Sequence, residues 1–177
     1  RKACARDAPG GRDRRGTASR PVGLRGLRLA ALSEPTQKAL RRILVPEASV
    51  LNPVDMVAGA GASEYGGALP LLLADPGVDL VITIFVPPVN VDPVGVARTI
   101  FEATRDATKP VLGCFMAREQ VVNAIKELDH SWFPIYDWPE QAVRAAWHLV
   151  RARRLKDDDL GEAEAFPDVD HAAVSTR

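Results

Sequence analysis

The residues that could do chemistry lie in two loops, and the first is the glycine-rich segment 51–65. There, Gly59 and Gly61 precede Ser63 and Glu64. A helix that begins after such a loop leaves backbone N–H groups free, and these groups can bind an anion such as phosphate. Ser63 is a good N-cap residue, so we expect the helix to begin after it. A purely structural turn is the alternative interpretation of this loop.

The second loop, 85–93, leaves an apolar segment and enters a candidate helix. Its paired prolines, Pro87 and Pro88, are followed by Val89. Two prolines stiffen a turn and remove two backbone donors, so this loop is better suited to form a wall than to cradle phosphate. Asp92, directly before a proline, is most simply the cap of the next helix.

Two polar residues of the first loop, Asn52 and Asp55, could also face a ligand. Asp55 follows a weak candidate strand, and a hydrogen bond within a turn is an equally good explanation for it. The loop is not a dinucleotide fingerprint, because Glu64 stands where the third glycine would be sought. No phosphate-binding loop of the G-x-x-x-x-G-K-[ST] type occurs in the sequence.

Other reactive side chains give weaker signals. His130, His148 and His171 have no partners at metal-ligand spacing and are interpreted as surface residues, so we expect no metal site. The two cysteines, Cys4 and Cys114, are too few for a disulfide scaffold. Cys114 lies within an apolar run and is expected to pack in the core rather than act as a nucleophile.

The elements that must position these loops alternate between strand-like and helix-like segments. Short runs rich in β-branched residues predict central strands over 78–85 and 110–115, with weaker strands over 53–57 and 133–136. Capping residues and apolar spacing predict helices over 34–43, 92–106, 117–128 and from 137 onward. Another helix is expected after Ser63, and Pro70 should kink it or end it early. This alternation predicts an α/β fold with a three-layer, flavodoxin-like parallel sheet. In such sheets ligands bind at the carboxyl ends of the strands, where both loops are expected.

Both ends of the chain differ in charge composition from the alternating segments between them. Residues 1–28 carry nine Lys or Arg and two Asp, and residues from about 156 onward are rich in Asp and Glu. The basic segment has no aromatic residues for stacking, so we expect no nucleic-acid partner. We expect residues 1–25 to be a disordered or aberrant basic segment, 26–155 to be the folded domain, and 156–177 to be an acidic linker.

Composition also limits the location of the protein. No apolar run reaches the roughly 18 residues that a membrane span needs, and no secretory signal is recognisable, so we expect a cytoplasmic protein without a membrane partner.

Five segments in register resemble one protein family. They read NPVDM, ADPGVDLVITIFVPPV, KPVL, FPIY and PEQAV, and begin at residues 52, 74, 109, 133 and 139. The sequence over 26–154 resembles the third, flavodoxin-like domain of the NDP-forming acyl-CoA synthetases, the acetate–CoA ligase family. That domain is similar to the C-terminal CoA-ligase domain of the succinyl-CoA synthetase β subunit. The segment FPDVD at 166–170 resembles the linker that precedes an ATP-grasp domain.

The resemblance implies the reaction acyl-CoA + NDP + phosphate ⇌ acid + CoA + NTP, through an acyl phosphate and a phosphohistidine. It implies that this domain binds no cofactor alone, whereas the whole enzyme uses CoA, ADP or ATP, and Mg. The partners would be the CoA-binding, phosphohistidine and ATP-grasp domains of the same enzyme or of a partner subunit. Helix N-termini stabilise the phosphoryl group in this family, and the loop 59–64 corresponds to one of them. The residues expected to line the phosphoryl or acyl-phosphate site are Asn52, Asp55, Gly59, Gly61, Ser63, Glu64, Pro87, Pro88 and Val89.

Two departures of the sequence from the family matter most. The nucleophilic histidine of the family belongs to a preceding domain that this sequence lacks, so we expect no catalytic residue in the chain and no activity alone. The apolar strand and Gly-rich turn that should open the domain are replaced by the Arg-rich residues 1–25. We therefore expect a fragment, read upstream in a shifted frame, whose sheet lacks its first βα unit. The alternative is a non-catalytic acyl-CoA-binding or regulatory module of a GNAT-type protein lysine acetyltransferase, in which the same domain set occurs.

Overall fold

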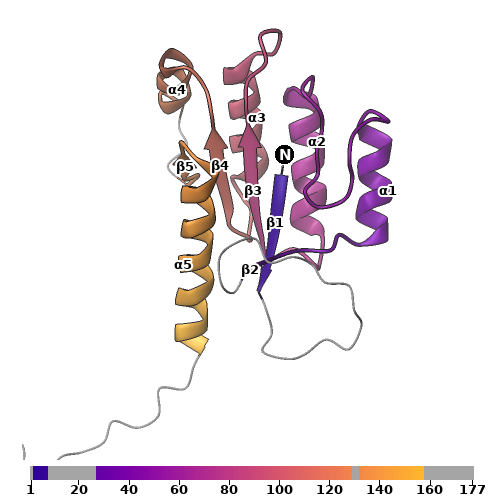
Figure 1. The fold of residues 1–177 in the computed structure, drawn as a ribbon, viewed down its shortest axis with the longest axis vertical. Coiled ribbons are helices and arrows are strands. Elements are labelled where there is room, and N and C mark those ends of the chain that lie inside the picture. Colours follow the sequence, from indigo (N-terminus) through magenta and orange to yellow (C-terminus); the bar gives the residue numbers. More distant parts are fainter. Residues whose placement is uncertain (1, 8–26, 129–131, 158–177) are drawn as a thin grey trace, which may run out of the picture.

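The structure, a computed structural model, describes the backbone of residues 2–7 and residues 27–128 and 132–157. Its strands are β1 (Lys2–Asp7), β2 (Leu27–Leu29), β3 (Leu80–Phe85), β4 (Val111–Phe115) and β5 (Ile135–Tyr136). Its helices are α1 (Glu34–Ile43), α2 (Ala62–Ala74), α3 (Pro93–Thr104), α4 (Glu119–Lys126) and α5 (Pro139–Asp157). The chain therefore alternates strand and helix from β3 onward, as the sequence predicts (Figure 1).

The sheet has the strand order β2-β1-β3-β4-β5. Strands β3, β4 and β5 pair in parallel, which confirms the predicted α/β class with a parallel sheet. Strand β1 runs antiparallel to both β2 and β3, so one side of the sheet is mixed. The structure differs here from the expectation for residues 1–25, because Lys2–Asp7 forms a strand; the other residues of that range lie outside the described part.

Helices cover both faces of the sheet (Figure 1). Side chains alternate along a strand, so Val81 and Phe85 of β3 enter the larger core beneath α1 to α4. Leu80 and Ile82 point to the other face and pack with Ala142 and Ala146 of α5. Two apolar cores on either side of one sheet are the three layers that the sequence predicts.

Several element boundaries differ from the prediction. Residues 53–57 form no strand; Val54 and Asp55 make isolated bridges only, one of them between Asp55 and Ser49. Helix α2 continues through Pro70 to Ala74, so the early end expected at this proline is wrong. At the start of α5, the Gln141 side chain reaches back toward the preceding turn, its Oε1 accepting from the backbone N–H of Trp138 at 3.3 Å. In the described part, no helix is long and apolar enough to span a membrane.

Candidate functional site

The two loops predicted to carry chemistry meet at the carboxyl edge of β3. A Cβ atom placed on Gly61, at the start of α2, would lie 3.9 Å from Cγ1 of Val91 in the second loop. The Tyr65 hydroxyl, one turn into α2, donates a hydrogen bond of 3.0 Å to the carbonyl oxygen of Ile84 in β3. These contacts bring the first turn of α2 against the point where β3 becomes the second loop.

Helix α2 begins at Ala62, and its N-cap is Gly61 rather than Ser63. Gly61 is the N-cap, and the Glu64 carboxylate accepts a hydrogen bond from its backbone N–H at 2.8 Å. Only this half of a capping box can form here. A glycine N-cap has no side-chain oxygen that could accept a hydrogen bond from the backbone N–H of Glu64. Ser63 lies in the first turn and is exposed, so its predicted capping role is wrong, although it remains at the helix start.

The start of α2 still has open hydrogen-bond donors that an anion could use. Within the described residues, the backbone N–H groups of Ala62, Ser63 and Glu64 have no hydrogen-bond acceptor. The first N–H groups of a helix carry roughly half a positive charge together. Glu64 places a carboxylate beside them, so an arriving anion would share this end of the helix with a fixed negative charge.

Neither loop glycine is required by packing. Around Gly59 no atom of the described residues lies within 4 Å of an added Cβ, and around Gly61 the nearest such atom, Glu64 Oε2, would be 3.8 Å away. The backbone of the loop turns instead at Val57, whose φ of 59° is unusual for a β-branched residue. The Val57 N–H donates to Oδ1 of Asp55 at 3.1 Å, which helps to hold this turn.

Asn52 and Asp55 have different roles in the structure. The Asn52 side-chain amide donates to the carbonyl oxygen of Ala30 at 2.8 Å and so ties its loop to the segment after β2. Asp55 lies close enough to Tyr65 for its charge to act on the phenol. Burial raises the pKa of Tyr65 far above its usual value, and the negative charge of Asp55 raises it further. Tyr65 therefore stays protonated and keeps its donor on Ile84.

The second loop forms an exposed apolar rim. Val86 and Val89 are exposed, whereas Pro87 and Pro88 are half-buried. The loop closes on itself through the Val91 N–H, which donates to the carbonyl oxygen of Pro88 at 3.3 Å. Asp92 caps α3, with Oδ1 accepting from the Val94 N–H at 3.0 Å, as the sequence predicts.

Aromatic rings in the core pack together next to both loops. Tyr65 packs edge-on against Phe85 with ring centroids 5.5 Å apart, and Phe85 contacts Phe115 of β4 in the same manner at 6.1 Å. Such edge-to-face pairs add about 0.5–1.5 kcal/mol each beyond the area that they bury. Sequence reasoning missed Tyr65; its only signal was a tyrosine one turn after a glycine-rich loop.

The other reactive residues take no part in this site. Cys114 is buried on the α5 face of β4, where burial, with Glu140 and Asp137, raises the pKa of its thiol to about 11. His148 is exposed on α5 beside Trp147, and His130 and His171 lie outside the described residues. The described ranges contain no group of three His, Cys, Asp or Glu residues that could hold a metal ion.

No family model matches the chain. Among curated proteins, it is 41% identical over 134 residues to the alpha subunit of ADP-forming acetate–CoA ligase II from Pyrococcus furiosus. The match covers 73% of this chain and 29% of the relative. The chain therefore spans less than a third of the length of this relative.

Solved structures give the same picture. A crystal structure of PH0766 from Pyrococcus horikoshii has a TM-score of 0.67 and 39% identity, over 72% of this chain and 30% of that one. The dinucleotide-forming acetyl-coenzyme A synthetase 1 of Ca. Korarchaeum cryptofilum, in complex with phosphate and ADP, has a TM-score of 0.64 and 25% identity, over 76% of this chain and 30% of that one. The α/β body is thus related in sequence and fold to one segment of the ADP-forming acetate–CoA ligases, as the five matching segments indicated.

Proposed function

We propose that residues 26–155 form the CoA-ligase domain of an ADP-forming acyl-CoA synthetase, followed by a linker over 156–177. The reaction would be acyl-CoA + ADP + phosphate ⇌ acid + CoA + ATP, through an acyl phosphate and a phosphohistidine. The observation that carries this proposal is the 41% identity to an ADP-forming acetate–CoA ligase subunit. The agreement in fold with two structures, one of them a synthetase bound to phosphate and ADP, supports it.

The role of this chain would be electrostatic. A phosphoryl group carried on a histidine of another domain would be placed against the open N–H groups of α2, where donors fixed in advance stabilise developing negative charge. Gly59 and Gly61 would leave the approach free of side chains. Pro87, Pro88 and Val89 would form the apolar wall beside it and exclude water from the acyl phosphate.

Cofactors would be bound mainly elsewhere. CoA and ADP are substrates of the whole enzyme, and the described residues offer no acidic cluster for Mg²⁺. We therefore assign the metal, the nucleotide and the nucleophilic histidine to partner domains or a partner subunit, and we place the assembly in the cytoplasm. Asn52 and Glu64 would act mainly by holding the two loops in position.

A chimera tests the proposal. The full chain replaces the matching segment of the Pyrococcus furiosus alpha subunit, and ATP formation from acetyl-CoA, ADP and phosphate is measured with the beta subunit added. Turnover within about tenfold of the parent enzyme supports the proposal, and Gly61→Leu should lower that turnover at least tenfold by blocking α2.

The control is Arg98→Leu, an equally bulky change at an exposed position of α3. It should leave turnover unchanged, and both variants should melt within a few degrees of the parent. A well-folded chimera without turnover would contradict the assignment and favour a non-catalytic binding module. Turnover unaffected by Gly61→Leu would remove α2 from the site.

A further inference from the structure

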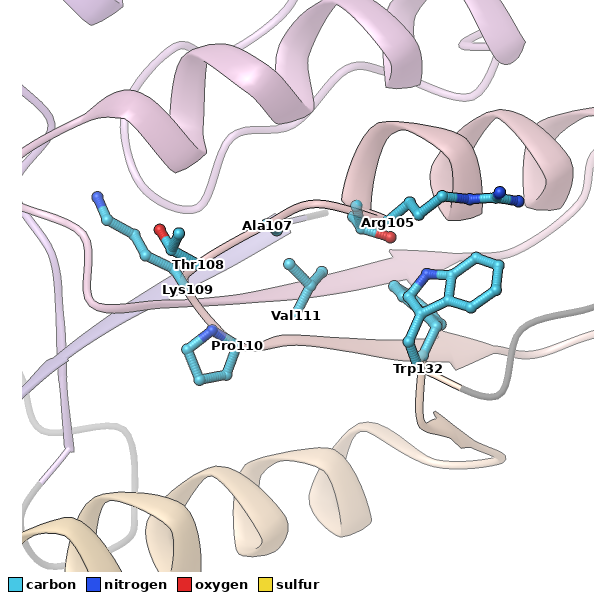
Figure 2. Close-up of a pocket in the computed structure, with 9 residues that line it drawn as sticks. Arg105, Ala107, Thr108, Lys109, Pro110, Val111 and Trp132 are labelled. Atoms are coloured by element: carbon cyan, nitrogen blue, oxygen red, sulfur yellow. The ribbon is translucent and has the colours of Figure 1, made fainter.

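A pocket lies at the opposite edge of the sheet from the two loops. It has a volume of about 240 Å³ and is formed where α3 ends, β4 begins and the chain approaches β5 (Figure 2). Its walls include the apolar residues Val111 and Phe133. The amino edge of a parallel sheet is not where the substrates of such folds usually bind, so this pocket is separate from the proposed catalytic site.

Among the described residues that line this pocket, the polar side chains are all hydrogen-bond donors and none is a carboxylate. They are Thr104, Arg105, Thr108, Lys109 and Trp132. Neither Arg105 nor Lys109 forms an ion pair in the described part of the chain. Lys109 uses one donor on the backbone oxygen of Asp75, at 2.7 Å, which leaves the other N–H groups of its ammonium available.

Trp132 provides the second observation. Its indole Nε1 is buried and has no hydrogen-bond partner among the described residues. Figure 2 shows this nitrogen on the side of the ring that faces Val111 and the interior of the pocket. A buried donor without an acceptor costs about 1–3 kcal/mol, and an entering oxygen atom would recover that cost. The ring is only partly buried, so a small rotation can place the N–H on such an atom.

Arg105 is held in place over the same ring. Its guanidinium carbon lies 4.8 Å from the centroid of the Trp132 indole. The end of α3 contributes about half a negative charge nearby. The full charges of Arg105 and Lys109 outweigh it, so the pocket remains favourable for an anion.

We propose that this pocket binds a small oxyanion, a phosphate or a carboxylate, between the Arg105 guanidinium and the Trp132 indole N–H. The volume exceeds that of a bare phosphate, and the apolar walls accept a short body attached to the charged group. Arg105 supplies a charge-assisted bond, and Trp132 supplies a neutral donor and a flat surface. Because the pocket lies away from the two loops, the bound anion is a regulatory ligand rather than the reacting group.

The test uses the full chain with ¹⁵N-labelled tryptophan, which gives three indole N–H signals, from Trp132, Trp138 and Trp147. The protein is titrated separately with inorganic phosphate, isobutyrate and the neutral isobutyramide. A saturable shift of the Trp132 signal with phosphate or isobutyrate supports the proposal. The anion that causes the shift shows whether the ligand is a phosphate or a carboxylate. The exposed Trp138 serves as the internal control and should not move.

Variants then separate binding from packing. Arg105→Gln should weaken binding, measured by calorimetry, about tenfold, since it removes a charged hydrogen bond. Trp132→Phe keeps the ring and loses only the N–H, and should weaken binding several-fold. Arg98→Gln removes a charge from the exposed face of α3 and should have no effect. No saturable shift with either anion, an equal shift with isobutyramide, or unchanged binding in Arg105→Gln would overturn the proposal.

Discussion

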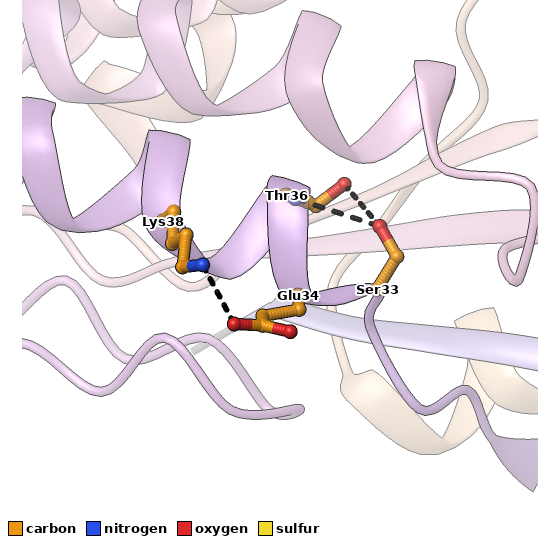
Figure 3. A network of polar contacts seen from close by, with 4 residues as sticks. All are labelled: Ser33, Glu34, Thr36 and Lys38. Carbon is orange, nitrogen blue, oxygen red and sulfur yellow. Dashed lines mark hydrogen bonds and ion pairs between the residues drawn. The ribbon is translucent and has the colours of Figure 1, made fainter.

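The Asp75 side chain connects three parts of the chain through hydrogen bonds. It is 1% exposed, and its two carboxylate oxygens accept from the backbone N–H groups of Ser33, at 2.8 Å, and Gly77, at 2.7 Å. Ser33 also caps α1, where its hydroxyl donates to that of Thr36 (Figure 3). Burial alone would raise the pKa of Asp75, but hydrogen bonds from Thr36, Ser33 and Gly77 outweigh it and lower the pKa.

This lowered pKa predicts a loss of stability in acid. The folded state holds the proton less tightly than the unfolded state, so the stabilisation is fully present above the unfolded value of about 4. It is lost as the pH falls from there through the folded pKa. Asp75→Asn should cost about 1–3 kcal/mol at pH 7, because an amide nitrogen cannot accept the second bond.

Urea unfolding of Asp75→Asn at pH 7 and pH 3 measures this effect. The difference between the parent and the variant should shrink at pH 3. A difference that is the same at both pH values would show that the cost comes from packing rather than from ionisation.

Replacing Val57 should increase the stability of the protein. Its φ of 59° crowds the Cβ atom against the backbone, while 42% of the side chain is exposed, so little burial offsets this cost. Asparagine tolerates this conformation better, and Val57→Asn should raise the free energy of unfolding by about 0.5–1 kcal/mol in denaturant titrations.

The matched control for Val57 is Val89→Asn, an exposed valine of the second loop without a positive φ. It should change stability very little. An equal gain in both variants would point to the removal of an exposed apolar side chain rather than to relief of strain.

At the scale of elements, β4 packs closely against the chain before β5 because Gly113 has no side chain. An added Cβ would overlap the ring of Phe133 and lie 2.9 Å from that of Phe115. Gly113→Ala should therefore cost about 1–3 kcal/mol through overpacking, measured by chemical unfolding. Gly59→Ala is the control, since its Cβ would meet nothing within 4 Å. If Gly113→Ala were as stable as Gly59→Ala, β4 and Phe133 would not be packed as described.

The elements also show what the sequence could predict. The bounds of α1 and the start of α3 follow from local capping by Ser33 and Asp92, so sequence patterns sufficed. The start of α2 was mispredicted because a serine is the commoner cap, whereas here Glu64 satisfies the N–H of a glycine. Strand β1 could not be predicted, because it depends on distant pairing with β2 and β3 rather than on its own composition.

In the candidate site, too, some features could be predicted from the sequence and others depend on tertiary packing. Parallel topology alone predicts that the two loops meet. The first loop leads into α2 and the second loop leaves β3, and in such a fold both points lie at the carboxyl edge of the sheet. The hydrogen bond from Tyr65 to Ile84 and the anchoring of Asn52 on Ala30 depend on tertiary packing, and no local pattern predicts them. The Trp132 pocket was missed for the same reason, since α3 and the chain before β5 form it together.

At the scale of the whole molecule, the chain spans 29% of its Pyrococcus furiosus relative, so its proposed activity belongs to a larger assembly. Its described part offers a helix N-terminus with open N–H donors and an apolar wall, but the proposed reaction also needs a histidine that another domain delivers. We therefore expect the N-terminus of α2 to stabilise the phosphoryl group of the acyl phosphate, from which this histidine accepts it.

Arsenate-dependent cleavage of acetyl-CoA by the chimera tests this claim most directly, because arsenate replaces phosphate and the acyl arsenate hydrolyses without nucleotide. Release of free CoA should depend on arsenate and should fall at least tenfold in Gly61→Leu but not in Arg98→Leu. A folded chimera that releases no CoA, or a Gly61→Leu variant that cleaves acetyl-CoA at the parent rate, would contradict it.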